Sequence, residues 1–235
     1  MILRYFIAFA FLIFPSLMDV SGSRTDGGDA SLSRPKPETA VAGLYRRMEL
    51  EGVVKWKAFR QAVEGYRTIK GRRREVLTLI DFSLPSTARR LWVLDMKAEK
   101  VLFQSVVSHG KNSGENYATS FSNKNGSHKS SLGFYLTGST YQGRNGYSLI
   151  LDGLEKGIND HARERAIVVH GADYADPSRV AKGGRLGRSF GCPALPRELN
   201  KPVIDAIKEG GVLFIYAEQP DYLAKSPVLR QVDSL

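Results

Sequence analysis

The sequence predicts a mainly β, β-rich α+β domain, either a sandwich or a partly closed barrel, with a few helices and an N-terminal helical extension. Seven short runs rich in Val, Leu, Ile and aromatic residues follow one another between residues 77 and 217, with turn residues between them. Strand and helix patterns do not alternate, which argues against a doubly wound parallel sheet. The 235 residues are enough for one domain with its own core.

The N-terminus carries the pattern of a secretory signal peptide over residues 1–22. Arg4 supplies a positive charge, residues 5–14 (YFIAFAFLIF) form an apolar run, and small residues follow Pro15. The apolar run is shorter than the about 20 residues that a membrane-spanning helix needs. We therefore expect export rather than a membrane anchor, with no stable membrane insertion after cleavage.

Two segments lie between the signal peptide and the strands. Residues 23–37, rich in Gly, Ser, Asp and Pro, have little to bury and predict a flexible linker. Residues 38–76 show two helical stripes and predict the helical extension, which we expect to dock on the main domain. The apolar positions of the stripes are Val41, Leu44, Tyr45 and Met48, then Trp56, Phe59, Val63 and Tyr66.

The main domain is predicted over residues 77–218, with a C-terminal tail at 219–235. Its strand-like runs are 77–83, 90–96, 100–108, 133–138, 147–153, 166–171 and 212–217. Asn145-Gly146 signals a tight hairpin turn before the fifth run. Short helices are predicted at 161–165, capped by Asn159 or Asp160, and at 201–208, where Gly210-Gly211 ends the helix.

Residues 110–131 fit neither a strand nor a helix. A polar loop of this length in a compact domain is usually a functional lid or a disordered insert, and both interpretations stay open at this point. Tyr117 and Phe121 are the side chains able to anchor it.

The net charge of +10 points to an anionic neighbourhood. Nucleic acid is a common partner of basic proteins, but an exported chain rarely meets it, so we expect none. An anionic cell envelope fits better. The alternative is that the charge is only solvated surface, as in the tract 70–74 (KGRRR).

Cys192 is the only cysteine in the chain, and it lies in the stretch RSFGCPA at 188–194. Exported proteins usually pair their cysteines, so three interpretations arise: an inert buried thiol, a partner for another chain, or a nucleophile. Gly191 permits backbone angles that other residues avoid, and Pro193 fixes the next φ. Such a turn can expose the sulfur beside free N–H groups, which an oxyanion site requires. The competing interpretation is an ordinary surface turn.

A thiol nucleophile needs a base, and four histidines are available. His170 and His109 end apolar runs and precede glycines, so strands would carry them to the rim of the domain. His128 and His161 lie in polar segments and are expected on the surface. No two of the four have the spacing of a known zinc site, so we expect no metal.

With His170-Gly171-Ala172 and the segment 189–192 (SFGC) in view, the chain resembles the L,D-transpeptidases, and most closely their murein L,D-transpeptidase catalytic-domain branch. Members of that branch carry G-R-S-x-G-C-P-A, which matches residues 187–194. Further similar stretches are 107–114 (VSHGKNSG), 121–127 (FSNKNGS), 130–135 (SSLGFY) and 151–160 (LDGLEKGIND). The resemblance extends over residues 77–218 and implies a β-rich domain with a catalytic cysteine in a cleft.

The resemblance also implies roles for individual catalytic residues. Cys192 matches the nucleophile and His170 matches the base. The backbone around Gly191 and Cys192 matches the oxyanion site, and Ser189 matches the hydroxyl that shapes the loop.

The surroundings of these residues depart from the broad family at two positions. Phe190 stands where the family has a second histidine, and Ala194 stands where it has an arginine. The candidate substrate-binding residues are His109, Arg185, Arg188 and Ser131. Of these, Arg185 ends the basic insert 182–185 (KGGR), for which two interpretations stay open: it meets a substrate carboxylate, or it has no ligand.

The activity implied is that of a cysteine L,D-transpeptidase acting on peptidoglycan stem peptides through a Cys192 thioester, without a cofactor. Its location would be the periplasm or cell envelope of a bacterium. Two alternatives remain: an L,D-carboxypeptidase with the same residues, or a non-catalytic cell-wall-binding module. The oligomeric state is left open.

Overall fold

The computed structural model describes residues 37–182 and 184–232. The predicted signal peptide (1–22) lies outside this part of the chain, as does the predicted linker (23–37) except for Pro37, which begins the first helix. Among the helices of the described residues, none has the length and apolar character needed to cross a membrane.

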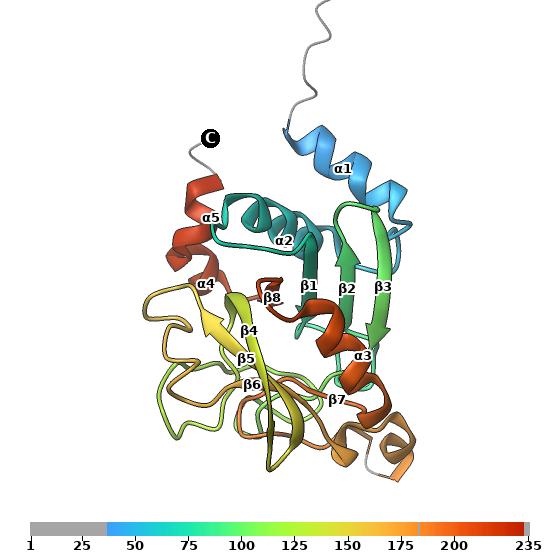
Figure 1. Cartoon of the computed structure of the whole chain (residues 1–235), viewed down its shortest axis with the longest axis vertical. Coiled ribbons are helices and arrows are strands. Elements are labelled where there is room, and N and C mark those ends of the chain that lie inside the picture. Colours follow the sequence, from blue (N-terminus) through green and yellow to red (C-terminus); the bar gives the residue numbers. More distant parts are fainter. Residues whose placement is uncertain (1–36, 183, 233–235) are drawn as a thin grey trace, which may run out of the picture. The chain divides into compact units, whose positions relative to one another are not determined.

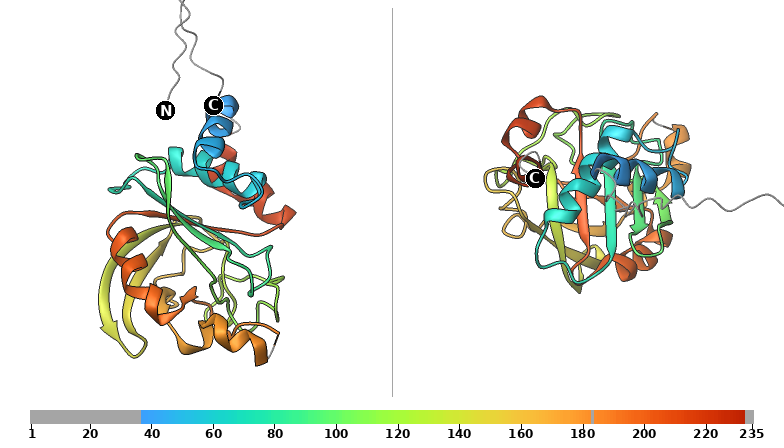
Figure 2. Two further views of the ribbon diagram at one scale, coloured as in Figure 1. Left: turned by 90° about the vertical axis from the view of Figure 1, so that its right-hand side faces the viewer. Right: turned by 90° about the horizontal axis from the view of Figure 1, so that it is seen from above.

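Within the described residues, one eight-stranded sheet forms the framework and curves into a partly closed barrel (Figures 1 and 2). The strands lie in the order β3-β2-β1-β8-β4-β5-β6-β7. Their bounds are β1 Val76–Asp81, β2 Leu91–Asp95, β3 Lys100–Ser105, β4 Gly133–Gly143, β5 Gly146–Gly153, β6 Val168–Gly171, β7 Ala194–Leu195 and β8 Val212–Tyr216. The predicted fold class, mainly β with few helices, is confirmed.

Two parallel pairings, β1 with β8 and β6 with β7, interrupt an otherwise antiparallel sheet. β4 and β5 form the hairpin that Asn145-Gly146 predicts, in which Gly143 pairs with Gly146. Gly146 has a φ of 77°, in the left-handed region that favours glycine after a tight turn. In Figure 1 the tip of this hairpin points away from the end of the sheet where α1 and α2 lie.

The helices gather at the two ends of the sheet. The α-helices are α1 Pro37–Arg47, α2 Trp56–Thr68, α3 Arg197–Ile207, α4 Pro220–Lys225 and α5 Pro227–Val232; the short 3₁₀ helices are η1 Asp173–Ala175 and η2 Pro177–Lys182. α1, α2, α4 and α5 lie at one end, and η1 and η2 lie at the opposite end (Figure 1). α3 packs against β1, β5 and β6.

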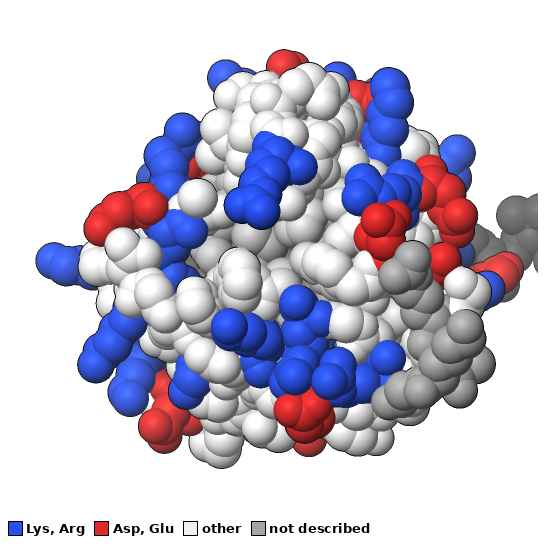
Figure 3. All heavy atoms as spheres, turned by 90° about the horizontal axis from the view of Figure 1, so that it is seen from below, with Lys and Arg blue, Asp and Glu red and all other residues white. Residues whose placement is uncertain are grey.

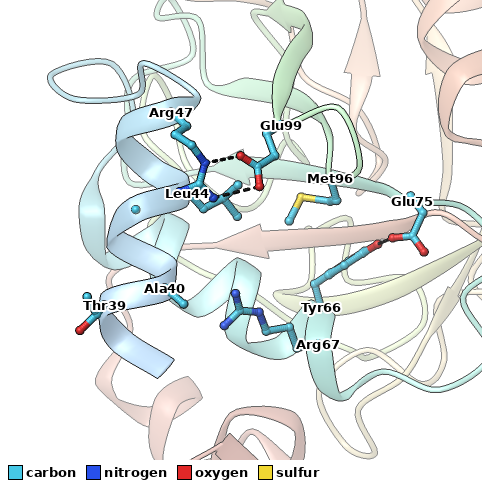
Figure 4. A pocket seen from close by; sticks show the side chains of 10 residues that line it. Thr39, Ala40, Leu44, Arg47, Tyr66, Arg67, Glu75, Met96 and Glu99 are labelled. Atoms are coloured by element: carbon cyan, nitrogen blue, oxygen red, sulfur yellow. Dashed lines mark hydrogen bonds and ion pairs between the residues drawn. The ribbon is translucent and has the colours of Figure 1, made fainter. Parts of the chain in front are cut away.

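The two N-terminal helices pack on the sheet and share its core. Phe59 of α2 belongs to the same buried apolar cluster as Phe134 and Phe214 of the sheet. At the edge of this contact, Arg47 of α1 forms a two-bond ion pair with Glu99 in the turn between β2 and β3 (Figure 4). The helical extension therefore docks through both apolar and ionic contacts.

A buried carboxylate ties the segment after β8 to the sheet. Glu155 is fully buried and accepts hydrogen bonds from the backbone N–H of Phe134 at 2.7 Å and from the hydroxyl of Tyr222 at 3.0 Å. It also accepts one from the hydroxyl of Ser226. Burial raises the pKa of the Glu155 carboxyl. α4 and α5, in the segment predicted as a tail, are thus attached to the core.

Several elements differ from the sequence predictions; η1 and η2, for example, lie where no helix was predicted. Residues 161–165 form turns rather than a helix. Asn159 does not cap a helix there because its side chain bonds instead to the backbone of Glu155, Leu132 and Phe134. α3 begins four residues earlier than predicted, at Arg197. β7 was not predicted, since two residues are too few to show a strand pattern.

The packing of α2 on β4 predicts opposite effects for two glycine substitutions. A Cβ at Gly65 would overlap the ring of the fully buried Phe134. Gly65→Ala should therefore lower the free energy of unfolding in urea by about 1–3 kcal/mol. Gly43→Ala on α1 is the matched control, since a Cβ there meets only the flexible end of Arg47. Helix propensity favours Ala by up to about 1 kcal/mol, so stability should hold or rise. Equal losses at both positions would contradict the close contact.

Candidate active site

β6 and β7 bring Cys192 and His170 to the same pocket. His170 pairs with Ala194 in the parallel register of the two strands. Two residues before His170, the backbone N–H of Val168 donates to Sγ of Cys192 at 3.5 Å. Cys192 lies two residues before β7 begins, and its side chain and that of His170 line the same pocket.

The pocket that these two side chains line has a volume of about 500 Å³. Its walls are the cysteine segment 188–192, the segment 165–167 before β6, the hairpin tip at 144–145, and Tyr174 in η1. Another pocket of about 500 Å³, lined by residues 47–50 and 99–101 among others, has no cysteine or histidine in its lining, so volume alone does not locate the site.

The turn that presents Cys192 is fixed by Ser189 and Gly191. The hydroxyl of Ser189 donates to the carbonyl of Cys192 at 2.6 Å and accepts from the N–H of Gly191 at 3.1 Å. Gly191 has a φ of 130°, and a Cβ there would lie 2.9 Å from both Ile167 Cδ1 and the carbonyl of Lys129. The conformation and the lack of space both require glycine at this position.

The predicted loop at 110–131 is hydrogen-bonded along the cysteine segment. The N–H of Lys111 donates to the carbonyl of Ser189 at 2.8 Å, and the N–H of Ser189 donates to the carbonyl of His109 at 2.9 Å. The hydroxyl of Ser130 donates to the carbonyl of Gly191 at 2.9 Å. The near ends of the loop therefore support the turn that holds Cys192.

Arg165 is a cation beside the sulfur that the sequence analysis missed. Its guanidinium donates to the carbonyls of Ser122 at 2.8 Å and Lys129 at 2.6 Å. It also reaches the hydroxyls of Ser127 and Ser131, both at 3.3 Å. Ser131, predicted as a substrate-binding residue, is buried and does not line the pocket; it contacts Arg165 instead.

Burial and charge act in opposite directions on Cys192. Burial raises the pKa of the thiol, whereas the Val168 N–H and the charge of Arg165 lower it. Burial also lowers the pKa of Arg165, which still carries its positive charge. A thiolate formed at Cys192 would therefore face a fixed cation.

The surroundings of His170 hold its imidazole neutral. Its Nδ1 lies 3.1 Å from the carbonyl oxygen of Gly171, and a carbonyl can only accept, so Nδ1 carries the proton. Nε2 is then the nitrogen with a free lone pair. Burial lowers the pKa of His170 below its usual value near 6.5, which keeps the ring neutral at pH 7.

Tyr174 is a second residue that the sequence analysis missed, because it lies in a short loop-like segment. Its ring meets that of His170 edge to face, with centroids 6.5 Å apart. Burial, with a contribution from the charge of Cys192, raises its pKa to about 12. The hydroxyl is thus a proton-bearing donor at neutral pH, in the wall of the pocket.

His109 is not brought to this pocket. It is only 1% exposed, and its Nδ1 accepts a hydrogen bond from the guanidinium of Arg90 at 2.8 Å. Its Nε2 lies 3.3 Å from the carbonyl of Gly114. Burial and the neighbouring Arg90 lower the pKa of His109 to about 4, so it remains neutral and structural in character.

The two predicted arginines of the cysteine loop share one carboxylate. Arg188 lines the pocket, but its Nη1 bonds to Glu115 at 2.6 Å and to the carbonyls of Lys111 and Gly114 at 3.0 and 2.9 Å. Arg185 does not line the pocket, and its Nε pairs with Glu115 at 2.8 Å.

Residues 51–216 match the family model described as the L,D-transpeptidase catalytic domain. The chain belongs to the L,D-transpeptidase catalytic-domain family. No curated protein sequence matches the chain at a significant level.

Several solved structures resemble this L,D-transpeptidase domain at low sequence identity. An L,D-transpeptidase from Mycobacterium smegmatis has a TM-score of 0.38 and 16% identity, covering 61% of this chain and 59% of that chain. One from Stackebrandtia nassauensis has a TM-score of 0.38 and 12% identity, covering 77% and 78%. The helical cell shape determining protein Pgp2 from Campylobacter jejuni has a TM-score of 0.42 and 13% identity, covering 74% and 60%. The chain spans less than two thirds of the length of the first three structures it matches.

Two residues of this L,D-transpeptidase domain stand where the broad family was expected to have a histidine and an arginine. Phe190 is 65% exposed at the rim of the pocket, with the ring of His128 and Nζ of Lys111 each 4.6 Å from its ring centroid. Ala194 is fully buried opposite His170. Neither side chain supplies a charge or a proton to the pocket; Arg165 and Tyr174 do carry such groups.

The charge of Arg165 predicts the reactivity of the thiol. Arg165→Met should raise the pKa of Cys192 and slow its alkylation by iodoacetamide at pH 8 by about three- to ten-fold, because only the thiolate reacts. Arg165→Lys keeps the charge and should retain most of the rate. The rate is followed by intact mass between pH 6 and 10.

A matched control is Arg163→Met, which removes a surface arginine paired with Asp152. This variant should react like the wild type. Equal losses in Arg165→Met and Arg165→Lys would mean that the loop contacts, rather than the charge, control the thiol.

Proposed function

We propose that the protein is an exported cysteine L,D-transpeptidase of the bacterial cell envelope that acts on peptidoglycan stem peptides. The observation that carries the proposal is the parallel pairing of β6 with β7, which places a lone thiol and a neutral imidazole in one pocket of a domain of this family. Cys192 is the proposed nucleophile and His170 the proposed base.

The first half-reaction forms a thioester on Cys192. Nε2 of His170 takes the thiol proton, and the sulfur attacks the carbonyl carbon of the third stem residue. Burial disfavours the charged forms of both groups, so we infer that the thiol and imidazole rest as a neutral pair and that the proton moves when substrate is bound. His170 then returns the proton to the departing amine of the terminal D-Ala.

The oxyanion of this step needs hydrogen-bond donors beside the sulfur. The N–H of Gly191 is already used by Ser189. In the described part of the chain, no carbonyl accepts the N–H of Cys192, which makes it the proposed backbone donor. The hydroxyl of Tyr174 is the proposed second donor, in a site where Phe190 supplies none.

The second half-reaction decides the product. If a side-chain amine of a neighbouring stem attacks the thioester and gives its proton to His170, the product is a cross-link. If water attacks instead, the same residues act as an L,D-carboxypeptidase. A non-catalytic wall-binding module is disfavoured, since such a module has no need of a base beside a thiol.

Acylation of Cys192 by imipenem tests the nucleophile. The strained β-lactam ring opens when the sulfur attacks, so the adduct should add the whole mass of imipenem to the protein. We expect a complete adduct on the wild type, none on Cys192→Ser, and about a hundred-fold slower formation on His170→Gln. Absence of an adduct on the wild type, or an equal adduct on Cys192→Ser, would refute the nucleophile. Incubation with stem tetrapeptides then separates cross-linked dimer from tripeptide.

The proposed donor role of Tyr174 predicts a loss of turnover without a loss of thiol reactivity. Tyr174→Phe should lower kcat on a stem tetrapeptide by about ten- to a hundred-fold, while iodoacetamide labelling of Cys192 changes little. Tyr216→Phe is the control, since it removes a buried hydroxyl that has no partner in the structure. An unchanged kcat in Tyr174→Phe would remove this residue from the mechanism.

A further inference from the structure

The pocket around Cys192 is lined by positive charge without matching negative charge. Arg144, Arg165 and Arg188 all line it, and none of its lining residues is Asp or Glu. On the face of the molecule seen from below, Lys and Arg side chains gather around a hollow, with acidic side chains at fewer places (Figure 3).

The three arginines differ in whether a negatively charged group lies beside the guanidinium. Arg188 is paired with Glu115, which it shares with Arg185, so its charge is partly compensated within the protein. The hydrogen bonds of Arg165 all go to carbonyl and hydroxyl oxygens, which carry no net charge. Arg144 has no hydrogen-bond or ion-pair partner among the described residues. Two uncompensated cations therefore face the pocket, and a concave surface concentrates their field.

Arg144 is also placed to hold a ligand group. It lies with Asn145 in the two-residue connection between Gly143 and Gly146, at the tip of the β4–β5 hairpin (Figure 1). Both side chains line the pocket. The paired glycines anchor the backbone, and neither the guanidinium nor the amide has a side-chain hydrogen-bond partner among the described residues. Two such donors side by side suit a carboxylate, which a guanidinium can bind through two parallel hydrogen bonds.

We propose that Arg144, with Asn145, forms a subsite for a free carboxylate of the stem peptide, so that the enzyme selects stems with free carboxylates over stems in which they are amidated. This inference rests on the proposed function. An amide has no charge and offers N–H groups to a guanidinium that needs acceptors, so amidation removes the attraction and leaves the arginine unpaired. Arg165 is not part of this subsite, because its hydrogen bonds go to the loop and its charge acts on Cys192.

The test measures binding separately from turnover. Calorimetry on Cys192→Ala, which cannot react, compares a stem tetrapeptide whose carboxyl groups are all free with one whose second- and third-residue carboxyls are amidated. We expect the free-acid peptide to bind about ten-fold tighter or more, in the range of a charge-assisted contact. Adding Arg144→Gln should abolish the preference by weakening only the free-acid peptide, and Arg144→Lys should retain part of it.

Two further experiments identify which stem carries the bound carboxylate and exclude an effect of the overall charge of the protein. A tetrapeptide with a blocked side-chain amine can act only as donor, and a tripeptide can act only as acceptor. If the preference for free carboxylates appears with only one of these peptides, that peptide identifies whether the bound stem is the donor or the acceptor. Arg60→Gln on α2, at the helical end of the molecule, removes the same charge and should change neither affinity.

Equal affinity for the two peptides, no binding of either, or an equal loss of both in Arg144→Gln would overturn the subsite. Failure of the proposed function has a different signature. In that case the wild type turns over neither peptide and forms no imipenem adduct, while a preference that depends on Arg144 in Cys192→Ala would still support the subsite.

Discussion

The parallel pairing of β6 with β7 is the contact on which the site depends. It sets His170 against Ala194 and brings the N–H of Val168 to the sulfur of Cys192. β7 has only two residues, so the pairing cannot be stable by itself; Ser108 extends it by bonding to Ala194 on the other side. The hydrogen bonds of Ser189 within the turn and the left-handed backbone at Gly191 then fix where the sulfur points.

Electrostatics in this pocket combine two opposing tendencies. Desolvation favours the neutral thiol and the neutral imidazole, whereas Arg165 and the N–H of Val168 favour the thiolate. Burial therefore favours the thiol form of Cys192, which oxidises more slowly than a thiolate. Arg165 also bonds the loop at 122–131 to the segment before β6. One side chain therefore affects both the pKa of Cys192 and the position of the loop.

The sequence predicted seven of the eight strands in the described residues and the hairpin, because apolar runs and an Asn-Gly turn are local signals. Cys192 and His170 were its candidate catalytic residues, and both line the pocket. Arg165 and Tyr174 could not be found in this way. Arg165 lies in a polar segment that resembles a surface helix, and its partners are 34 to 43 residues away in the chain. His109 ends an apolar run as His170 does, but its ring is buried and accepts a hydrogen bond from Arg90. Local pattern identifies the end of a strand but not whether that end meets solvent.

The buried carboxylate of Glu155 makes the folded domain depend on residues beyond its last strand. Its buried carboxylate depends on donors from Tyr222 and Ser226, which lie beyond the last strand. A fragment cut at residue 218 would keep every strand of the described residues and the pocket around Cys192, yet leave that carboxylate in an apolar interior with two of its donors gone. The smallest autonomous fragment is therefore larger than the sheet, and the limits of a family alignment underestimate it.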